Sequence, residues 1–290
     1  MSLVVRDIIQ MAEAQLERSE VINARLDAEL VFRHIFGVDK MGFFKLWGTE
    51  VDDSICDLYL DLIALRASGM PLQYITGEQE FMGFTFQVNP SVLIPRQDTE
   101  ILAEEAVSII NEKKAKNCSV LDLGCGSGAV GISIAKMCEG AKVAASDISE
   151  EAVKTARQNA RTLNVEKKMS FSVGDWLAPF KKRLGPKKFD LIVSNPPYVR
   201  SNVIPNLQTE IKDHEPLLAL DGGPDGLEHY RRIVPFAHLH LNKGGMIALE
   251  IGFDQAIAVA NIADECGKYS DFNLIKDLAG RNRVLVLVGS

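Results

Sequence analysis

The sequence lacks the features that mark a membrane or secreted protein. No stretch of about 18 apolar residues runs without a charge, so no membrane-spanning helix is expected. The opening residues, MSLVVRDIIQ, carry Arg6 and Asp7 inside their apolar stretch, so they are not expected to act as a signal peptide. The five cysteines are scattered and form no CxxC pair, which predicts reduced thiols in a cytoplasmic protein.

Basic residues are also in deficit, and no metal-binding pattern is present. The chain has 32 Lys and Arg against 39 Asp and Glu, a net charge of -7, so direct nucleic-acid binding is not expected. His238 and His240 are two residues apart and would point to different sides of a helix, so no metal site is predicted.

The 290 residues change character along the chain. In the first part, Val5, Ile8, Ile9, Ala12 and Leu16 recur at helical spacing, and two further helical stretches follow. The segment after Gly69 is rich in Gly, Pro, aromatic and β-branched residues and indicates a hairpin and linker. The sequence therefore predicts a helical domain over 1–75, a β-hairpin linker over 76–95 and a larger domain over 96–290.

The larger domain alternates short apolar strands with helices. The strands are expected at SVLDLG, KVAASD, MSFSVGD, FDLIVSN and GGMIALEIG, and a helix over 98–111, capped by Asp98 or Thr99, precedes them. Such alternation predicts an α/β fold with a parallel sheet covered on both faces. The last stretch, FNLIKDLAGRNRVLVLVG, predicts an antiparallel C-terminal hairpin.

A glycine-rich turn follows the first of these strands, in VLDLGCGSGAVGISIA. Its glycines, Gly124, Gly126 and Gly128, permit positive φ and let a ligand approach the backbone. The turn lies at the carboxyl end of a strand, where open α/β sheets bind ligands. A tight strand-to-helix connection is the alternative.

Two further segments narrow the choice of ligand. Asp147 ends the second strand and can accept hydrogen bonds from both hydroxyls of a ribose, although it can also cap the following helix. After the third strand, Asp175 can accept from an adenine amino group, and Trp176 offers a flat surface to the ring or packs in the core. The glycine turn has the spacing G-x-G-x-G and no Lys or Arg for a phosphate, so S-adenosylmethionine fits better than a dinucleotide.

The fourth strand ends abruptly at SNPPYV. The Asn195 side-chain oxygen and the Pro196 carbonyl can each accept one N–H of a planar –NH2 group, and Pro197 helps to fix the backbone. Tyr198 can cover the face of that group and favour developing positive charge. The motif resembles that of amino-methyltransferases, which act on nitrogens conjugated to a carbonyl or ring.

Over nearly its whole length the chain resembles the HemK family, the release-factor glutamine methyltransferases. The matching segments are, in order, NARLDAELVFRHIFG, PLQYITGEQEFMGFTFQVNPSVLIPRQDTE, VLDLGCGSG, SNPPYV and EPLLALDGGPDGLEHYRRI. The resemblance implies a Rossmann-like class I S-adenosylmethionine-dependent methyltransferase domain with a helical N-terminal domain that contacts the release factor. It implies methyl transfer to the side-chain amide nitrogen of the glutamine in the Gly-Gly-Gln motif of peptide chain release factors, with S-adenosylhomocysteine as product.

The resemblance also implies roles for particular residues. The cofactor site is expected at Gly124, Cys125, Gly126, Ser127, Gly128, Asp147, Asp175, Trp176 and Asn195. The glutamine is expected to lie against Asn195, Pro196, Pro197 and Tyr198. Gln97 departs from the family, which commonly has Pro in IPRPDTE, and we expect a looser turn before the next helix. We expect a monomer.

Two other functions remain open from the residues themselves. The exocyclic amines of nucleic-acid bases are also planar –NH2 groups, so N-methylation of a base is the alternative activity, and it would require a basic surface. A binding module with a vestigial cofactor site is the other, and it would bind S-adenosylmethionine without turnover.

Overall fold

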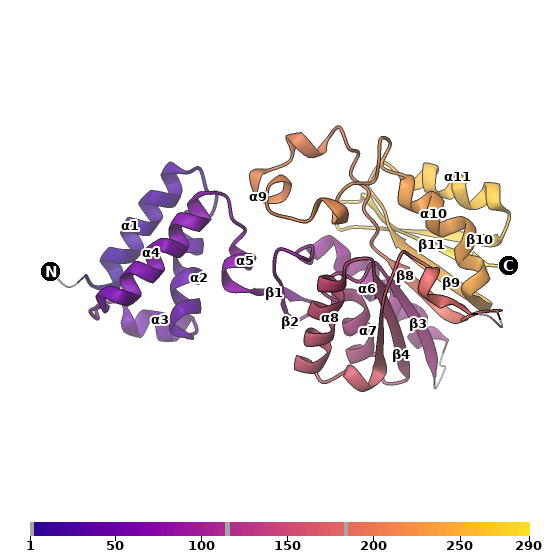
Figure 1. Cartoon of the computed structure of the whole chain (residues 1–290), viewed down its shortest axis with the longest axis horizontal. Helices are drawn as coiled ribbons and strands as arrows, with labels where there is room; N and C mark the ends of the chain where they lie inside the picture. The colour runs from indigo at the N-terminus through magenta and orange to yellow at the C-terminus, as the bar shows by residue number, and fades with distance from the viewer. Residues whose placement is uncertain (1–2, 114–116, 183–184) are drawn as a thin grey trace. The chain divides into compact units, whose positions relative to one another are not determined.

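The computed structural model describes residues 3–113, 117–182 and 185–290, which divide into two compact units (Figure 1). The smaller unit comprises Met1–Glu78 and a short separate segment, Gln208–His214. The larger unit comprises Gln79–Leu207 and Glu215–Ser290. Among the described residues, no helix is both long and apolar enough to cross a membrane.

The smaller unit is helical, as the spacing of apolar residues predicts. The five residues of the first predicted helical face, Val5, Ile8, Ile9, Ala12 and Leu16, are all buried. Gly37 ends the second helix with a φ of 59°, the left-handed conformation that glycine adopts readily at a helix C-terminus. The helices of the first 77 residues are α1 (Val5–Arg18), α2 (Ala24–Phe36), α3 (Lys40–Leu46), α4 (Asp53–Ala67) and α5 (Leu72–Thr76), of which α3 and α5 were not predicted.

A buried arginine connects three parts of the smaller unit. The Arg66 guanidinium, on α4, donates from Nε to Asp27 Oδ2 at 2.7 Å and from Nη2 to Glu210 Oε1 at 2.5 Å. Asp27 lies on α2, and Glu210 lies on α9 (Thr209–Lys212). Because both groups of the Arg66–Asp27 pair are buried, each one depends on the other to offset the cost of losing water.

The expected hairpin lies at β1 (Glu78–Phe81) and β2 (Phe84–Gln87), which form a two-stranded sheet. Its turn residues, Met82 and Gly83, both have positive φ, as tight hairpins require.

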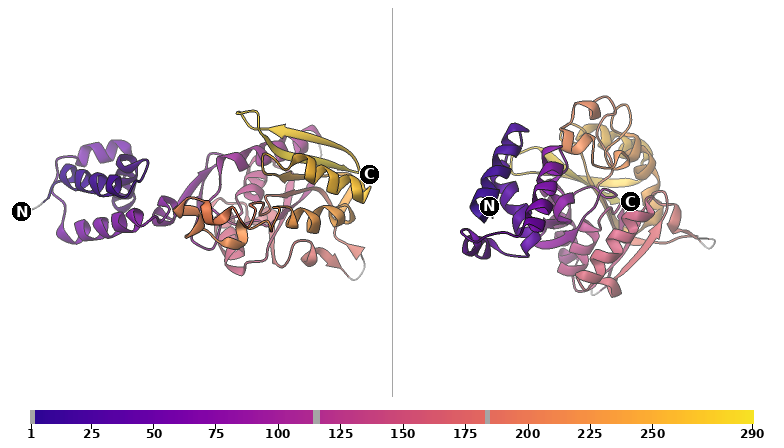
Figure 2. Two further views of the ribbon diagram at one scale, coloured as in Figure 1. Left: turned by 90° about the horizontal axis from the view of Figure 1, so that it is seen from above. Right: turned by 60° about the vertical axis from the view of Figure 1, so that its left-hand side comes forward.

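The core of the larger unit is a seven-stranded sheet with the order β10-β11-β9-β8-β3-β4-β5. Every strand predicted in the larger domain is present, and the two C-terminal strands pair antiparallel at one edge (Figure 2). The order reverses at β3, because β4 and β5 lie on one side of it and β8 and β9 on the other. The strands are β3 (Cys118–Leu123), β4 (Ala141–Asp147), β5 (Met169–Val173), β8 (Phe189–Ser194), β9 (Leu241–Glu250), β10 (Tyr269–Lys276) and β11 (Asn282–Gly289), with a separate pair β6 (Lys181–Lys182) and β7 (Gly185–Pro186).

Helices cover both faces of this sheet, which confirms the layered α/β architecture. Neighbouring strand residues alternate between the two cores: Val120 packs on one face and Leu121 on the other. One face is covered by α6 (Gln97–Glu112), α7 (Ala129–Met137) and α8 (Glu150–Thr162), and the other by α10 (Glu228–Ala237) and α11 (Ala256–Cys266) (Figure 1).

Candidate active site

A cavity of about 340 Å³ opens at the carboxyl ends of β3, β4, β5 and β8, within the larger unit. This is the edge of the sheet where the strand order reverses, the usual ligand site of such folds. Of the residues expected to form the site, those that line the cavity are Gly124, Cys125, Gly126, Ser127, Asp147, Asp175, Trp176, Asn195 and Pro197. Gly128, Pro196 and Tyr198 are not among its lining residues.

The glycine turn packs closely against its neighbours. Gly124 has a φ of 70°, and a Cβ there would lie 3.3 Å from the Trp176 ring. Gly128 also has a positive φ, and a Cβ there would lie 2.7 Å from Cδ1 of Ile132. Gly128 therefore allows the turn to pack closely on α7, whereas Gly124 allows the Trp176 ring to lie close to the backbone of the turn.

Two acidic side chains fix the backbone around this turn. Asp122 Oδ2 accepts from the Gly131 N–H at 3.0 Å, and burial raises the pKa of the Asp122 carboxyl to about 7. Asp147 accepts from the Gly126 N–H and the Ser149 N–H, each at 2.9 Å. The cap of α8 is Ser149, whose hydroxyl accepts from a backbone N–H, so the alternative role of Asp147 as the cap of this helix is wrong.

The segment after β5 forms another wall. Trp176 has a φ of 45°, rare for a large side chain, and its ring centroid lies 5.2 Å from that of His229. Asp175 forms an ion pair with Arg232, and both also line the cavity. The wall thus combines one flat apolar ring with charged groups at its rim.

The SNPPYV segment begins where β8 ends, at Ser194, as the two prolines predict. Asn195 Nδ2 donates to the Thr99 hydroxyl at 3.1 Å, which leaves Asn195 Oδ1 as the acceptor of that side chain. The Tyr198 hydroxyl donates to Glu250 Oε1 at 3.2 Å. Because β3 and β8 are paired neighbours, the glycine turn and Asn195 lie at adjacent strand ends.

Comparison with known proteins gives consistent matches over both units. Residues 114–272 match the family model described as a methyltransferase domain, and residues 7–77 match the PrmC N-terminal domain. The chain is 38% identical over 281 residues to a release factor glutamine methyltransferase of Moorella thermoacetica, covering 97% of each chain. It is 40% identical over 263 residues to one of Clostridium acetobutylicum, covering 90% of each.

The chain belongs to the release factor glutamine methyltransferase family. Several solved structures with low sequence identity to this chain are similar to it in fold. A T. Thermophilus 16S rRNA methyltransferase in complex with AdoMet and guanosine has a TM-score of 0.53 at 19% identity, covering 73% of this chain and 50% of that one. The N-terminal domain of human METTL16 in complex with SAH has a TM-score of 0.52 at 14% identity, covering 79% and 82%.

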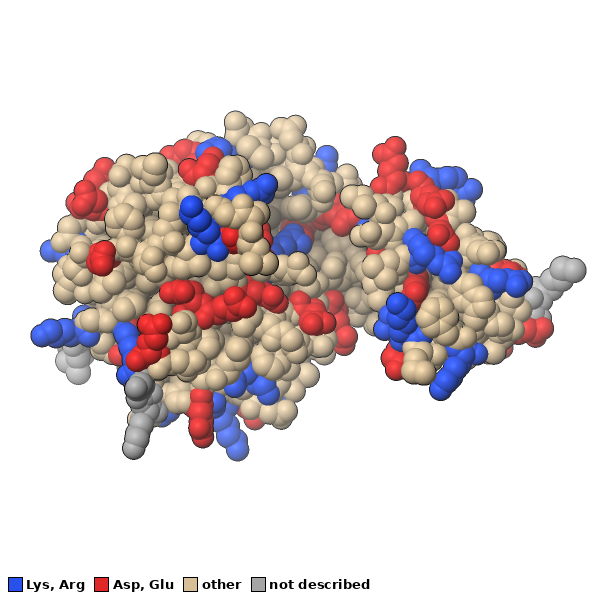
Figure 3. Space-filling view, turned by 180° about the vertical axis from the view of Figure 1, so that it is seen from behind, with Lys and Arg blue, Asp and Glu red and all other residues tan. Residues whose placement is uncertain are grey.

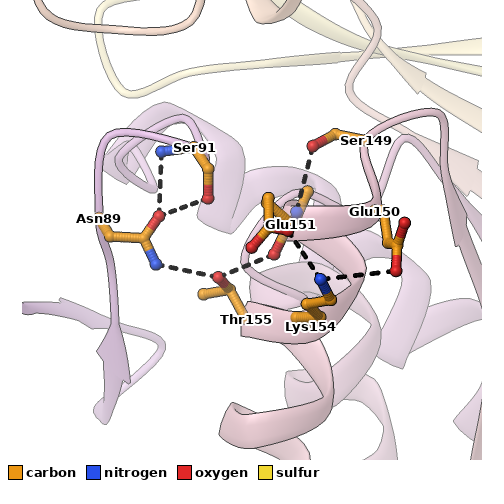
Figure 4. A network of polar contacts seen from close by, with 8 residues as sticks. Asn89, Ser91, Ser149, Glu150, Glu151, Lys154 and Thr155 are labelled. Atoms are coloured by element: carbon orange, nitrogen blue, oxygen red, sulfur yellow. Dashed lines mark hydrogen bonds and ion pairs between the residues drawn. The ribbon is translucent and has the colours of Figure 1, made fainter.

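One wall of the site in this family member was not predicted. The segment between β2 and α6 contributes Ser91, Val92, Leu93 and Pro95 to the cavity. Asn89 holds it in place, since its Oδ1 accepts from the Ser91 N–H at 2.9 Å and its Nδ2 donates to Thr155 Oγ1 at 3.0 Å (Figure 4). The sequence signal is the Asn-Pro-Ser turn, whose Asn side chain bonds the backbone two residues on.

A second ion pair fixes another part of the rim in this methyltransferase. Arg96 pairs with Glu215, whose side chain is only 1% exposed. The residues after Glu215 include Pro216, Leu218 and Ala219, which line the cavity. The pair therefore joins the start of α6 to the long segment that follows SNPPYV.

The start of α6 differs from the prediction. The helix begins at Gln97 with Arg96 as its N-terminal cap residue, so the expected cap by Asp98 or Thr99 is wrong. Both side chains have other partners: Asp98 pairs with Arg283 at 2.9 Å, and the Thr99 hydroxyl accepts from Asn195. Gln97 occupies the first helical position, where the usual Pro of the family would also be accommodated.

Proposed function

We propose that this protein transfers a methyl group from S-adenosylmethionine to the side-chain amide nitrogen of the glutamine in the Gly-Gly-Gln motif of peptide chain release factors. The observation that carries the proposal is the position of Asn195 beside the glycine turn, in a chain whose relatives are release factor glutamine methyltransferases over nearly their whole length.

The cavity suits S-adenosylmethionine, which supplies an activated methyl group on its sulfonium. The glycine turn brings backbone close to the ligand, Asp147 retains lone pairs for ribose hydroxyls, and the Trp176 ring offers an apolar face to adenine. The turn from Gly124 to Gly128 contains no Lys or Arg, which agrees with a ligand that has no phosphate. Asp175 is paired with Arg232, and one of its oxygens remains for the adenine amino group.

In this mechanism, Asn195 Oδ1 and the Pro196 carbonyl each accept one N–H of the substrate amide. Accepting both hydrogens raises electron density on a nitrogen whose lone pair is otherwise delocalised, and it aims that lone pair at the methyl group. The N–C bond forms as the S–C bond breaks with its electron pair going to sulfur, and one amide proton is released to water. Tyr198 does not line the cavity itself; in this proposal its ring covers the face of the substrate amide while positive charge develops on the nitrogen.

The domain roles follow from the same proposal. Residues 1–75 would recognise the release factor, residues 76–95 would link the domains, and residues 96–290 would carry the methyl transfer. The match of residues 7–77 to the PrmC N-terminal domain supports the first assignment. We infer that the protein acts as a monomer. We infer a cytoplasmic location from the proposed substrate, because release factors act where translation ends.

Methylation of a nucleic-acid base is less well supported. On the face drawn in Figure 3, Lys and Arg side chains are scattered among Asp and Glu side chains and form no broad basic field. Recognition of a phosphate backbone rewards clustered positive charge.

The test uses purified protein, labelled S-adenosylmethionine and three acceptors: a release factor, the same factor with the Gly-Gly-Gln glutamine changed to Ala, and a nucleic-acid pool. We expect label on the intact factor alone. Label on nucleic acid with none on the factor would overturn the proposal, and cofactor binding without any transfer would favour a binding module.

Asp147→Ala is expected to weaken binding of S-adenosylmethionine by about 10- to 100-fold. This change in affinity corresponds to the loss of one hydrogen bond to a charged group. Isothermal titration calorimetry measures the change. The matched control is Asp264→Ala on the exposed side of α11. Equal affinities in both variants would remove Asp147 from the cofactor site.

A further inference from the structure

Glu250 is a buried carboxyl that the proposed mechanism does not use. It is the last residue of β9 and is 1% exposed. β9 runs parallel to β8 with Leu249 opposite Ser194, so Glu250 follows at the level of Asn195. Its Oε1 accepts from the Tyr198 hydroxyl, while its Oε2 is buried with no hydrogen-bond partner among the described residues. Glu250 therefore lies at the level of Asn195 on the neighbouring strand and contacts Tyr198 of the same segment.

Thr99 lies between this carboxyl and Asn195. Its hydroxyl accepts from Asn195 Nδ2, so its own hydrogen remains to be donated. Burial raises the pKa of the Glu250 carboxyl and the Thr99 hydroxyl lowers it, so Thr99 is a close polar neighbour of this carboxyl. Because a buried carboxylate oxygen requires a donor, the hydrogen of Thr99 is best directed at Glu250.

The direction of this chain of bonds matters for Asn195. A hydroxyl both donates and accepts, so Thr99 alone would bond equally well to the oxygen or the nitrogen of the Asn195 amide. An ionised carboxylate only accepts. Glu250 therefore draws the Thr99 hydrogen to itself, and the hydroxyl oxygen is left to accept from Nδ2 of Asn195. This arrangement leaves Oδ1 available.

We propose that Glu250 and Thr99 are positioning residues, which hold the Asn195 amide with its oxygen free to accept an N–H from the substrate. Glu250 at the same time holds the Tyr198 ring through its hydroxyl. The inference rests on the proposed function, because it takes Asn195 Oδ1 to be an acceptor for the substrate amide.

The ionisation of Glu250 should then control activity near neutral pH. Burial raises its pKa to about 7, an effect opposed by the hydrogen bonds and by the Arg283 charge from β11. Asp98 on α6 raises the pKa further, and Tyr230 on α10 donates to the Glu250 backbone carbonyl at 2.8 Å. Glu250 is ionised above this pKa, so we expect kcat to rise between about pH 6 and 8.

Protonation would reverse the chain of bonds. A neutral Glu250 can donate to Thr99, and Thr99 can then donate to Oδ1 of Asn195, which occupies the oxygen that the substrate needs. The same rise in pH lowers stability, because a buried carboxyl with a raised pKa binds its proton more tightly in the folded state. Activity and stability should therefore change in opposite directions, which a purely structural role would not produce.

The kinetic test compares Glu250→Gln and Thr99→Val with the unchanged protein on intact release factor. We expect each to lower kcat by about 10- to 100-fold, as removal of the residues that orient metal ligands does in metalloenzymes. The Kd of S-adenosylmethionine should change by less than about 3-fold, under 1 kcal/mol. Thr99→Ser keeps the hydroxyl and should recover most of kcat. Glu265→Gln and Thr162→Val, both exposed and outside the cavity, are the matched controls.

The pH profile supplies a second readout. In Glu250→Gln the rise of kcat between about pH 6 and 8 should be lost. Asp122, whose pKa is also raised to about 7, is present in both proteins, so the difference between the two profiles reports Glu250.

A third readout needs no substrate. With selective ¹⁵N-asparagine labelling, the side-chain NH2 resonances of Asn195, assigned by their loss in Asn195→Ala, should shift with pH around the titration of Glu250. They should not titrate in Glu250→Gln. Unchanged resonances, kcat and pH profile in Glu250→Gln would overturn the inference. If the protein without substitutions does not methylate release factor, the proposed function fails. The Asn195 resonances then still show whether Glu250 and Thr99 position the Asn195 amide.

Discussion

Asn195→Ala is expected to lower kcat for release factor methylation by about 100- to 1,000-fold, the range found when one preorganised hydrogen-bonding group is removed from an active site. The substrate amide would lose the acceptor that orients it, and its nitrogen would no longer be aimed at the methyl group. Binding of S-adenosylmethionine should weaken by no more than about 10-fold, since one neutral hydrogen bond contributes about 1 kcal/mol. Transfer of labelled methyl under saturating cofactor measures the first effect, and calorimetry measures the second.

Asn261→Ala is the matched control, because Asn261 is exposed on α11 and does not line the cavity. It should leave kcat unchanged. An Asn195→Ala variant with more than about a tenth of normal kcat would contradict the proposed mechanism, because a loss that small corresponds to less than 1.4 kcal/mol of barrier.

Arg66→Met is expected to destabilise the smaller unit by about 3–5 kcal/mol, because it leaves the buried Asp27 carboxylate without its cation. The contact with Glu210 contributes less, since the Glu210 side chain is 41% exposed and remains hydrated when the pair is broken. Native-state hydrogen exchange measures the loss for each unit separately. Amides of α1, α2 and α4 should exchange faster, while those of β3 and β4 should not change.

The double variant Asp27→Leu with Arg66→Met tests the cause. Replacing both charges by apolar side chains removes the unpaired carboxylate, so most of the lost stability should return. Arg6→Met is the control for losing an arginine, because the Arg6–Asp7 pair is largely exposed and should contribute less than about 1 kcal/mol. A loss from Arg66→Met no larger than that of the control would show that this pair does not stabilise the unit.

The local elements and the motifs could be predicted from the sequence because their signals are short in range. The spacing of Val5, Ile8 and Ile9 indicates a helix by itself, and the prolines of SNPPYV end β8 wherever the strand lies. The glycine turn is also indicated by its own residues, because its glycines directly follow the apolar strand. The resemblance to a family added the substrate, which no local pattern determines.

The supporting partners of the site could not be predicted in this way. Thr99 and Asn195 are 96 residues apart, and Arg96 and Glu215 are 119 apart. Nothing in LIPRQDTE or EPLLAL indicates which distant side chain each will meet. The prediction of a cap at Asp98 or Thr99 was wrong because capping is a local rule, whereas both side chains bond to partners brought close by the sheet.

The sequence by itself determined the alternation of strands and helices, the glycine turn and the asparagine that follows β8, since each depends on residues within one element or one turn. Only the tertiary structure decided that Glu250 lies at the level of this asparagine and that Thr99 lies between them. Strand order and register decide which strand ends become neighbours. Both are set by packing over the whole sheet, and no single element determines them.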